Sequence, residues 1–388
     1  MDFVDQIYIK YPTKWRNTSI YLSASKDKIG DNSYLYQPTF RLLNQFMTDK
    51  QYILVTGGAG YIGSHTLIEL LANPQFEVIS LDNLSNSSGK TYHRIEQITG
   101  KKIIHAETNL CDAAALDLFF AKHPTIYGII HFAAFKSVPD SVSDPLGYYS
   151  NNIGSLVNLL QAASKYAIRN IIFSSSCSVY GNIRELPVTE DTPFQKAESP
   201  YAYTKVVGER ILEDYINSCP EAKAISLRYF NPVGAHISGL IGEDQINPPT
   251  NLVPLITQTA IGKRKSFSVF GTDYPTRDGS CIRDYVHVSD IARAHVQALQ
   301  YLEKTPTRYH VFNLGTGNGV SVLEAIEAFR KVSGINPAYL LGQRREGDVE
   351  AIFSDCKKVF KALNWKAKYS LEDMMESAWK WEMQMGRD

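Results

Sequence analysis

The sequence predicts an α/β protein with a doubly wound parallel sheet and a smaller C-terminal α/β region. Three observations support this fold class: short apolar runs alternate with segments of helix length, a glycine-rich turn follows the first run, and long loops begin after Pro232. The chain has 388 residues, of which 44% are hydrophobic, so it can bury a substantial core in one large domain or two intimate ones.

Six runs between residues 52 and 231 have the composition of buried strands. They are apolar on both faces, and stretches that could hold helices separate them. Strands of this kind form parallel sheets that helices cover on both sides. The predicted strands are 52–57, 76–83, 101–108, 127–134, 169–176 and 224–231.

The chain changes character beyond Pro232. Loops dominate 231–251 and 271–280, and helices are predicted at 288–302 and 321–334. A smaller region with long loops is typical of a lobe that holds a substrate.

The first 47 residues carry many tyrosines, lysines, asparagines and serines and show little periodicity. Met47 is followed by a short polar leader and an apolar strand, as at the start of a protein. We therefore interpret 1–47 as an N-terminal extension of unknown role without catalytic parts. A short accessory segment is the alternative.

Charge and cysteine content restrict the expected partners. Forty Lys and Arg balance forty Asp and Glu, so we expect neither nucleic acid nor an anionic membrane as a partner. The five cysteines include no Cys-x-x-Cys pair, which argues against a disulfide framework and a zinc site, and we expect no metal. There is no signal-peptide core and no apolar run near the roughly 20 residues of a membrane span. We expect a cytoplasmic protein.

Gly57, Gly60 and Gly63 lie between the first strand and a predicted helix, spaced as G-x-x-G-x-x-G. Such a turn lets the backbone approach a pyrophosphate, and the helix N-terminus adds N–H donors and partial positive charge. Asp82 ends the next strand 19 residues after Gly63, where its carboxylate can bind a ribose diol and repel a 2′-phosphate. The pattern predicts a Rossmann-type site for NAD rather than NADP. A tight turn without a ligand is the alternative.

Tyr201 and Lys205 stand four residues apart in "SPYAYTK", so a helix would present them on one face. A phenol is a poor base near neutral pH, but a neighbouring ammonium and an oxidised nicotinamide together favour the phenolate. The tyrosine can then take a proton from a sugar hydroxyl while hydride leaves the attached carbon. A surface helix with an ordinary tyrosine and a solvated lysine is the alternative.

Serines gather at the end of the predicted strand 169–176, at positions Ser174, Ser175, Ser176 and Ser178. Ligands of open α/β sheets collect at the carboxyl ends of strands. A hydroxyl both donates and accepts hydrogen bonds, which suits a substrate oxygen that alternates between alcohol and ketone. Serines that merely turn the chain are the alternative, but three motifs in this order favour an active site.

Several motifs together resemble one family of nucleotide-sugar enzymes. They are the glycine turn, "SSSCSVYG", "SPYAYTK", "RYFNPVGAH", "FGTDYPTRDG", "RDYVHVSD" and "RREGD". In this order they resemble the motifs of the UDP-glucose (UDP-galactose) 4-epimerase family, which belongs to the extended short-chain dehydrogenase/reductase superfamily. The resemblance extends from about Tyr52 to Trp381, and it implies an NAD-binding Rossmann domain at 48–231 and a nucleotide-sugar-binding domain at 232–388. Segments near 283–300 would pack back on the Rossmann domain.

The resemblance assigns roles to the residues that match the family's motifs. Tyr201 would be the catalytic base, and Lys205 would hold the nicotinamide ribose and lower the pKa of the tyrosine. Ser176 would bind the reacting hydroxyl, with Ser178 nearby. Asn109 replaces an aspartate that meets the adenine in relatives, but its carbonyl oxygen can still accept a hydrogen bond. The residues expected to bind the cofactor are Gly57, Gly60, Tyr61, Ile62, Gly63, Asp82, Asn83, Asn109, Leu110, Phe132, Ala133, Lys136, Asn152 and Lys205.

The resemblance also implies a site for a UDP-sugar. Arg283 and Arg345 would clamp the diphosphate with their planar guanidinium groups, and Asp348 would bind the uridine ribose. The strand through Ser268 and Phe270 would cover the uracil. The residues expected to contact the substrate are Lys136, Ser176, Tyr201, Tyr229, Asn231, Asn251, Leu252, Ser268, Phe270, Arg283, Arg345, Asp348 and Ile352.

The implied reaction is the reversible, NAD-dependent epimerisation of UDP-glucose and UDP-galactose at C4 through a transient 4-ketone. Cys177 and Ser178 stand where 4,6-dehydratases carry acidic residues, which argues against elimination. Ile352 has an intermediate volume at a position that limits the room beside C2 of the sugar, so a UDP-GlcNAc 4-epimerase is an alternative. A non-catalytic NAD-sensing protein is the alternative from another class. The family also implies a homodimer through helices around 146–166 and 200–218.

Overall fold

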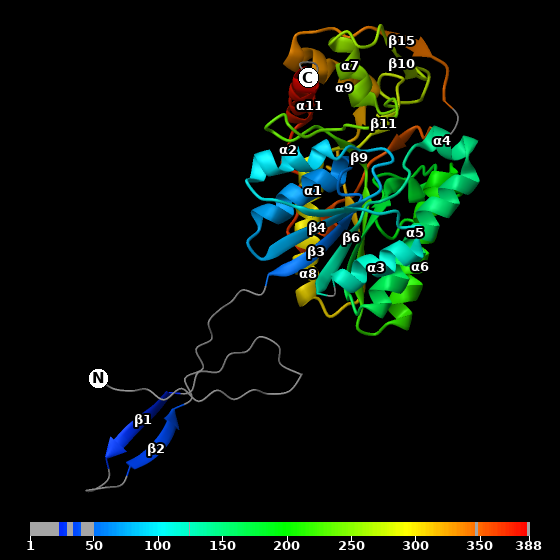
Figure 1. Ribbon diagram of the computed structural model, residues 1–388. Coiled ribbons are helices and arrows are strands. Elements are labelled where there is room, and N and C mark those ends of the chain that lie inside the picture. Colours follow the sequence, from blue (N-terminus) through cyan, green and yellow to red (C-terminus); the bar gives the residue numbers. More distant parts are fainter. Residues whose placement is uncertain (1–22, 29–33, 40–49, 124, 346–347, 386–388) are drawn as a thin grey trace. The chain divides into compact units, whose positions relative to one another are not determined.

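The computed structural model of the chain describes residues 23–28, 34–39, 50–123, 125–345 and 348–385. The chain divides into two compact units, Met1–Asp49 and Lys50–Asp388 (Figure 1). In the first unit, strands β1 (Ser23–Lys28) and β2 (Tyr34–Thr39) form an antiparallel pair. The rest of the predicted extension, 1–47, lies outside the described residues, and its role stays a prediction.

A seven-stranded parallel sheet forms the centre of the second unit. Its strands are β3 (Gln51–Thr56), β4 (Phe76–Asp82), β5 (Ile104–Glu107), β6 (Ile126–His131), β7 (Asn170–Ser176), β8 (Lys223–Tyr229) and β13 (Tyr309–Leu314). The order β13-β8-β7-β6-β3-β4-β5 shows that the chain builds outward from β3, returns to β6 and then builds outward in the other direction. This reversal is the topological switch point of a doubly wound, Rossmann-type sheet. The predicted fold class is confirmed.

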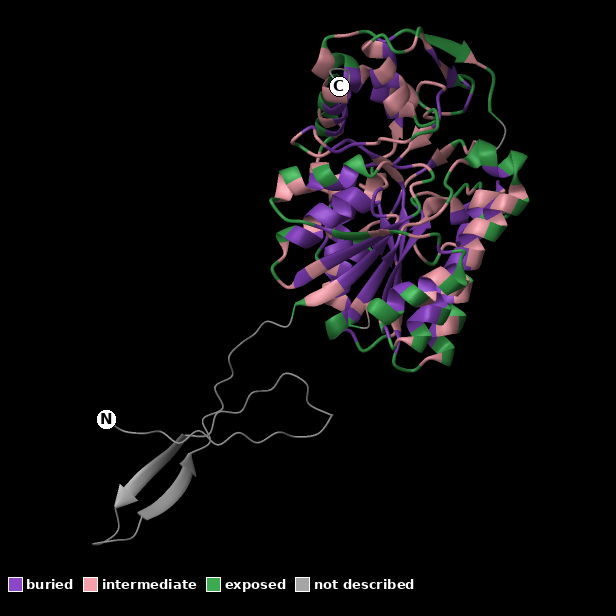
Figure 2. Ribbon diagram, viewed as in Figure 1, coloured by how far each residue is buried: buried purple, intermediate pink, exposed green. Residues whose placement is uncertain are grey.

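Helices cover both faces of the sheet (Figure 1). One face carries α1 (Tyr61–Ala72), α2 (Lys90–Thr99) and α8 (Val288–Lys304), and the other carries α3 (Ala113–Lys122), α5 (Pro145–Lys165) and α6 (Pro200–Ser218). Successive side chains of a strand point to opposite faces, so Ile53 and Val55 enter one apolar core and Leu54 enters the other. Figure 2 shows the central strands as almost wholly buried between these layers.

The chain from Asn231 onward contributes a smaller group of elements, drawn above the sheet in Figure 1. Its elements include α7 (Leu252–Ala260), α9 (Val322–Ser333), α11 (Leu371–Met385), β9 (Asn231–Val233), β10 (Phe267–Phe270), β11 (Ile282–Arg283), β12 (Tyr285–His287), β14 (Val320–Ser321), β15 (Tyr339–Gly342) and β16 (Ala351–Ile352). The helices α7, α9 and α11 pack with β10 into a third apolar core. The short strands pair as β10–β15, β14–β11–β16 and β12–β9. Elsewhere the chain forms α4 (Val138–Ser143), the 3-10 helix η1 (Cys177–Tyr180) and α10 (Lys357–Leu363).

The two predicted domains, 48–231 and 232–388, are joined by elements that cross between these ranges. Strand β13 lies in the second range but completes the sheet beside β8. Helix α8, which contains most of 283–300, packs against α1. The exact limits of the two domains stay a prediction.

Two further observations concern membrane-spanning helices and cysteines. Among the residues that the structure describes, no helix is both long enough and apolar enough to cross a membrane. All five cysteines belong to the described residues and are free thiols. Cys281 is buried, Cys111 is exposed, and Cys177, Cys219 and Cys356 are partly buried.

Candidate active site

A cavity of about 1100 Å³ opens at the carboxyl ends of the sheet strands. Its wall takes residues from the ends of β4, β7 and β8, from the turns after β3, β5 and β6, and from β11 and β16. Gly57 follows β3 and Phe132 follows β6, so the switch point opens into this cavity, as expected for ligands of open α/β sheets. A pocket for one small ligand measures roughly 300–1,000 Å³. The volume of this cavity exceeds that range.

Most residues predicted to form the site line this cavity. They are Gly57, Gly60, Tyr61, Ile62, Gly63, Asp82, Asn83, Asn109, Leu110, Phe132, Ala133, Lys136, Ser176, Ser178, Tyr201, Lys205, Tyr229, Asn231, Asn251, Arg283 and Ile352. The predicted contacts that lie outside its wall are Asn152, Leu252, Ser268, Phe270, Arg345 and Asp348. Leu252 packs against the third apolar core, and Ser268 in β10 pairs with Leu340 of β15. The cavity thus brings the predicted cofactor and substrate residues into one space.

The glycine turn connects β3 to α1 with its backbone close to neighbouring segments. Gly57 has φ +71°, and a Cβ there would lie 2.7 Å from the backbone nitrogen of Ala133. A Cβ on Gly63 would lie 2.2 Å from the carbonyl oxygen of Gly57. No side chain caps α1 at Gly60, so the N–H groups of its first turn are left for another acceptor. This is the arrangement that binds a phosphate at a helix N-terminus.

Asp82 links the end of β4 to the glycine turn. Its Oδ2 accepts a hydrogen bond from the backbone N–H of Ala59 at 3.0 Å. Its Oδ1 accepts hydrogen bonds from the N–H of Leu84 and the hydroxyl of Ser87, each at 2.9 Å. A carboxylate offers about four acceptor positions, so three protein donors leave capacity for a ribose hydroxyl.

Tyr201 and Lys205 occupy successive turns at the start of α6. Ser199 begins this helix, because its hydroxyl accepts the N–H of Ala202 at 3.2 Å and a proline follows it. Nζ of Lys205 donates a hydrogen bond to the carbonyl oxygen of Ser174 at 2.7 Å and lies 5.9 Å from the ring centroid of Tyr201. The helix therefore presents the predicted phenol–ammonium pair to the cavity at the end of β7.

Burial changes the pKa of both residues. It raises the pKa of Tyr201 from 10.0 to about 12, while the nearby hydroxyl of Ser176 acts in the opposite direction. It lowers the pKa of Lys205 from 10.5 to about 8, while the Glu209 carboxylate acts in the opposite direction. Lys205 is not among the groups that shift the pKa of Tyr201 in the protein alone, so its expected lowering of that pKa stays a prediction for the NAD-bound protein. The second expected positive charge, that of an oxidised nicotinamide, belongs to the cofactor.

The serines at the end of β7 have different surroundings. The hydroxyl of Ser176 accepts the N–H of Ser178 at 3.2 Å and caps η1. The hydroxyl of Ser178 is buried and has no hydrogen-bond partner among the described residues. Ser175 points to the interior and donates to the Glu209 carboxylate. Of these serines, Ser176 is the one whose hydroxyl acts to lower the pKa of Tyr201.

Asn152 lies behind the cavity wall and fixes its shape. Its Oδ1 accepts the N–H of Phe135 at 2.8 Å, and its Nδ2 donates to the carbonyl oxygen of the same residue at 3.0 Å. Nδ2 also donates to the hydroxyl of Thr204 at 3.2 Å. The predicted cofactor contact therefore holds the segment after β6 against α6.

Three charged residues from the predicted UDP-sugar site form one cluster. Nη2 of Arg345 lies 2.8 Å from Oδ1 of Asp348, and Nη2 of Arg283 lies 3.7 Å from the same oxygen. The guanidinium of Arg345 stands 5.5 Å from the ring centroid of Phe270. Of the two predicted clamp residues, Arg283 lines the cavity, and Arg345 is connected to it through Asp348.

Two carboxylates that no sequence motif singled out belong to this region. Glu243 lines the cavity and accepts hydrogen bonds from Lys136 and Asn251. Glu209 lies one turn beyond Lys205 on α6 and forms a buried, bidentate ion pair with Arg228. Glu209 lies four residues after Lys205 on a predicted helix, so this spacing could have identified it from the sequence. Glu243 lies in a loop and carries no such signal.

A family model described as "NAD dependent epimerase/dehydratase family" matches residues 53–315. The chain belongs to this family. The matched range includes the glycine turn, the serines after β7 and the Tyr201–Lys205 pair. The predicted resemblance to nucleotide-sugar epimerases and the predicted use of NAD are confirmed.

Curated members of the family are similar to the chain over nearly their whole length. The UDP-glucose 4-epimerase of Bacillus subtilis is 48% identical over 330 residues, which are 85% of this chain and 96% of the relative. That of Dictyostelium discoideum is also 48% identical over 330 residues, 85% of this chain and 95% of the relative. The crystal structure of the Bifidobacterium longum UDP-glucose 4-epimerase in complex with NAD+ and UDP has a TM-score of 0.83 and 44% identity, and the match covers 86% of this chain and 98% of that chain.

NAD, the cofactor that the family's name includes, fits the residues of this site. The glycine turn would admit the pyrophosphate to the uncapped first turn of α1, because no larger residue than glycine fits at Gly57 or Gly63. Asp82 would bind the adenosine ribose and disfavour the 2′-phosphate of NADP. Lys205 would reach the nicotinamide ribose from α6.

Proposed function

We propose that the protein catalyses the reversible, NAD-dependent epimerisation of UDP-glucose and UDP-galactose at C4. The names of its curated relatives and the related structures with NAD support this activity. The observation that carries the proposal is that Tyr201, Lys205 and Ser176 line the same cavity as the glycine turn. A group that transfers protons and a dinucleotide site share one space, which suits the oxidation and re-reduction of a bound alcohol.

Tyr201 is the proposed acid and base of the reaction. When bound, NAD supplies a reversible acceptor for the hydride on C4 of the sugar. Tyr201 takes the proton of the C4 hydroxyl as that carbon is oxidised, and it returns the proton when the ketone is reduced. The original oxidation state is restored at the end of each cycle, so the reaction needs no external oxidant.

Two neighbours assist Tyr201 in this proposal. The hydroxyl of Ser176 acts to lower the pKa of the phenol, and it would hold the substrate hydroxyl, since it both donates and accepts hydrogen bonds. Lys205 is buried beside the ring, and its positive charge favours the phenolate. Because the pKa of Tyr201 is raised to about 12, mainly by burial, the base also needs the positive charge of the oxidised nicotinamide.

Inversion at C4 requires that both faces of the ketone meet the cofactor in turn. We assign the anchoring of the UDP group to Arg283, with Asn231 and Asn251 in the same wall. Arg345 and Asp348, which already contact each other, would complete this anchor. The sugar would then turn about its diphosphate linkage between the two hydride transfers. Binding affinity would thus come from contacts with the UDP group, while the sugar would stay free to rotate.

A sugar-nucleotide 4,6-dehydratase is the second enzymatic candidate, because it begins with the same oxidation. Elimination of water also needs an acid–base pair beyond the tyrosine. At the two positions after Ser176 the chain carries Cys177, whose pKa burial raises to about 12, and Ser178. Neither provides a carboxylic acid, which favours epimerisation. A protein that only senses NAD would have no need for the Tyr201–Lys205 pair.

We also propose a homodimer that forms through α5 and α6. Leu146 of α5 is 78% exposed and Tyr203 of α6 is 49% exposed. The ring of Tyr203 packs edge-on against that of Tyr149, with centroids 6.2 Å apart. Large apolar side chains on adjacent helices suit an isologous interface. Light scattering on the purified protein tests this, and a monomer at micromolar concentration would exclude it.

The free thiols support the further proposal of a cytoplasmic location.

Conversion of UDP-galactose tests the proposed reaction. The purified protein with NAD is incubated with UDP-galactose, and nucleotide sugars are separated by chromatography while absorbance reports free NADH. We expect UDP-glucose to form without net NADH. No conversion, or one NADH released for each sugar consumed, would contradict the proposal. Formation of a 4-keto-6-deoxy sugar would instead identify a dehydratase.

A further inference from the structure

Glu243 joins two parts of the cavity wall that are far apart in the sequence. Its Oε1 accepts a hydrogen bond from Nζ of Lys136, in the segment after β6, at 2.7 Å. The same oxygen accepts a hydrogen bond from Nδ2 of Asn251, the residue before α7, also at 2.7 Å. Both donors are among the residues predicted to contact the substrate, whereas Glu243 matches none of the motifs.

Burial makes this carboxylate dependent on its partners. The side chain of Glu243 is 8% exposed, and that of Lys136 is 45% exposed. A carboxylate in the wall of a cavity that receives a diphosphate repels the ligand unless a cation neutralises it. Lys136 supplies that cation. One ion pair thus removes the repulsion and directs an ammonium and an amide toward the cavity.

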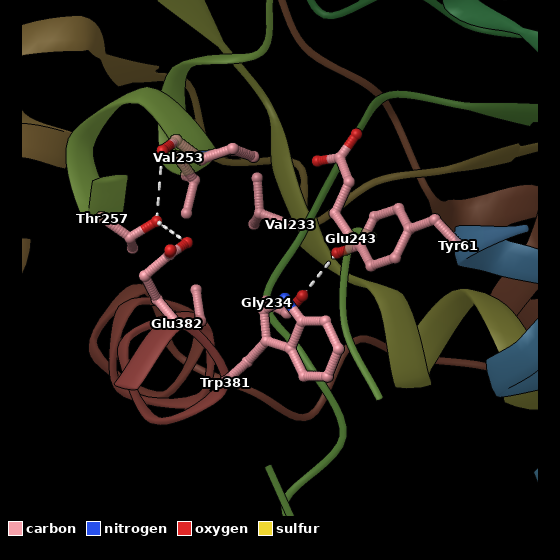
Figure 3. A pocket seen from close by; sticks show the side chains of 10 residues that line it. Tyr61, Val233, Gly234, Glu243, Val253, Thr257, Trp381 and Glu382 are labelled. Atoms are coloured by element: carbon pink, nitrogen blue, oxygen red, sulfur yellow. Dashed lines mark hydrogen bonds between the residues drawn. The ribbon is translucent and has the colours of Figure 1, made fainter. Parts of the chain in front are cut away.

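The far side of Glu243 faces a small second pocket, shown in Figure 3. This pocket measures about 20 Å³, which is room for about one water molecule. Tyr61 lies beside Glu243 there and donates its hydroxyl to the carbonyl oxygen of Gly234 at 2.5 Å. Burial, together with the nearby Glu243 carboxylate, raises the pKa of Tyr61 well above its ordinary value. Glu243 is therefore enclosed on this side as well.

We propose that Glu243 is a positioning residue for the UDP-sugar. Its carboxylate holds the ammonium of Lys136 and the amide of Asn251 in place before the ligand arrives. A lysine loses much rotamer entropy when it is immobilised, so a lysine that is already held binds an anion at a lower free-energy cost. Glu243 transfers no proton in this role. The inference rests on the proposed function, because it names the ligand of the same cavity.

The chain contains a matched control for this ion pair. Glu382 accepts a hydrogen bond from Nζ of Lys263 at 2.7 Å and a second from the hydroxyl of Thr257 at 3.1 Å. The side chains of Glu382 and Lys263 are 7% and 44% exposed, nearly the same as in the Glu243 pair. Figure 3 shows Glu382 on the small pocket, and it does not line the large cavity. Replacement of Glu382 should therefore change the free energy of unfolding about as much as replacement of Glu243, without changing the ligand site.

The test compares Glu243→Ala, Glu243→Gln and Glu382→Ala in the NAD-bound protein. Calorimetry gives the Kd for UDP-glucose, and initial rates give KM and kcat for UDP-galactose. We expect Glu243→Ala to raise Kd and KM by about 10- to 100-fold with kcat within about 3-fold. Glu243→Gln keeps the shape and one acceptor oxygen, so a rise of about 3- to 10-fold is expected. Glu382→Ala should leave Kd and KM within about 2-fold.

A double-mutant cycle separates positioning from a structural role. In a Lys136→Met background, Glu243→Ala should raise Kd by less than about 3-fold or lower it, because the lysine that Glu243 holds is gone and the unpaired carboxylate repels the diphosphate. Additive losses, an unchanged Kd in Glu243→Ala, or an equal loss in Glu382→Ala would overturn the inference. If Glu243→Ala unfolds, Glu243→Gln carries the test. A parent protein that binds UDP-glucose without converting it would contradict the proposed reaction, while the ratios of Kd would still decide the role of Glu243.

Discussion

Nζ of Lys205 donates a hydrogen bond to the backbone carbonyl oxygen of Ser174 at 2.7 Å. This bond fixes α6, which carries Tyr201, to the end of β7, which carries Ser176. The lysine predicted to bind the nicotinamide ribose therefore also connects two elements of the fold. Because its ammonium is buried, its protonation affects stability as well as the proposed reaction.

Lys205→Met should stabilise the nucleotide-free protein at neutral pH and abolish its activity. Burial lowers the pKa of Lys205 from 10.5 to about 8 in the folded state. Between these two values the unfolded chain binds more protons than the folded protein, so the stability of the parent rises with pH across this window. Below about pH 8 the parent bears the full cost of a buried charge. The Lys205→Met variant avoids this cost but loses one hydrogen bond. Its free energy of unfolding below about pH 8 should therefore exceed that of the parent by roughly 2 kcal/mol.

Denaturant unfolding of the parent and the Lys205→Met variant, at about pH 7 and about pH 10, measures this difference. The advantage of the variant should shrink at the higher pH. An advantage of the same size at both pH values would show that the charge of Lys205 is not the cause.

Tyr201→Phe should lower kcat by about 10³-fold or more, because the substrate proton then has no acceptor. NAD should remain bound, since the glycine turn and Asp82 are unchanged. The ratio of nucleotide to protein after purification and the rate with UDP-galactose check both statements. Tyr203→Phe, two residues further along α6 and 49% exposed, is the control and should keep its activity. A Tyr201→Phe variant with normal turnover would remove Tyr201 from its role.

Glu209→Gln should destabilise the protein by about 3–5 kcal/mol, because it leaves the buried guanidinium of Arg228 without its charged partner. Their side chains are 6% and 4% exposed. The Arg210–Asp214 pair on the same helix is the control, with side chains 72% and 59% exposed. Asp214→Asn should cost less than about 1 kcal/mol. Equal shifts of the unfolding midpoint in the two variants would contradict this account.

Ile352 should set the preference between plain and N-acetylated sugars. It lines the cavity and is buried in β16, opposite Arg283 of β11. We expect the parent to prefer UDP-glucose over UDP-GlcNAc, and Ile352→Ala to shift the ratio of kcat/KM toward UDP-GlcNAc by about 10-fold or more. Ile352→Tyr should shift it the other way. The two sugars in competition give the ratio directly, and a parent that strongly prefers the acetylated sugar would reverse the assignment.

Local patterns predicted the sheet well because its strands are apolar on both faces. The predicted strands 52–57, 76–83 and 169–176 correspond to β3, β4 and β7 within about two residues. Strand β13 was not predicted. It joins the sheet beside β8 after a long excursion through the smaller group of elements, and such a pairing leaves no local pattern in the sequence.

The candidate site could be predicted only where residues follow a motif. The glycine turn, Asp82 and the Tyr201–Lys205 pair keep fixed spacings that the sequence shows, and in the structure they line one cavity. Glu243 could not be predicted, because its partners come from segments more than 100 residues before it and eight residues after it. The pKa of Tyr201 was also out of reach, since burial depends on the whole fold.

The fate of the hydrogen on C4 is the most direct test of the central claim that a single enclosed site oxidises and re-reduces the same carbon. UDP-galactose that carries deuterium at C4 is converted by the NAD-bound protein in ordinary water, and NMR locates the label in the product. The account predicts UDP-glucose that keeps deuterium at C4, because Tyr201 exchanges only the hydroxyl proton. Loss of the deuterium to water would contradict it.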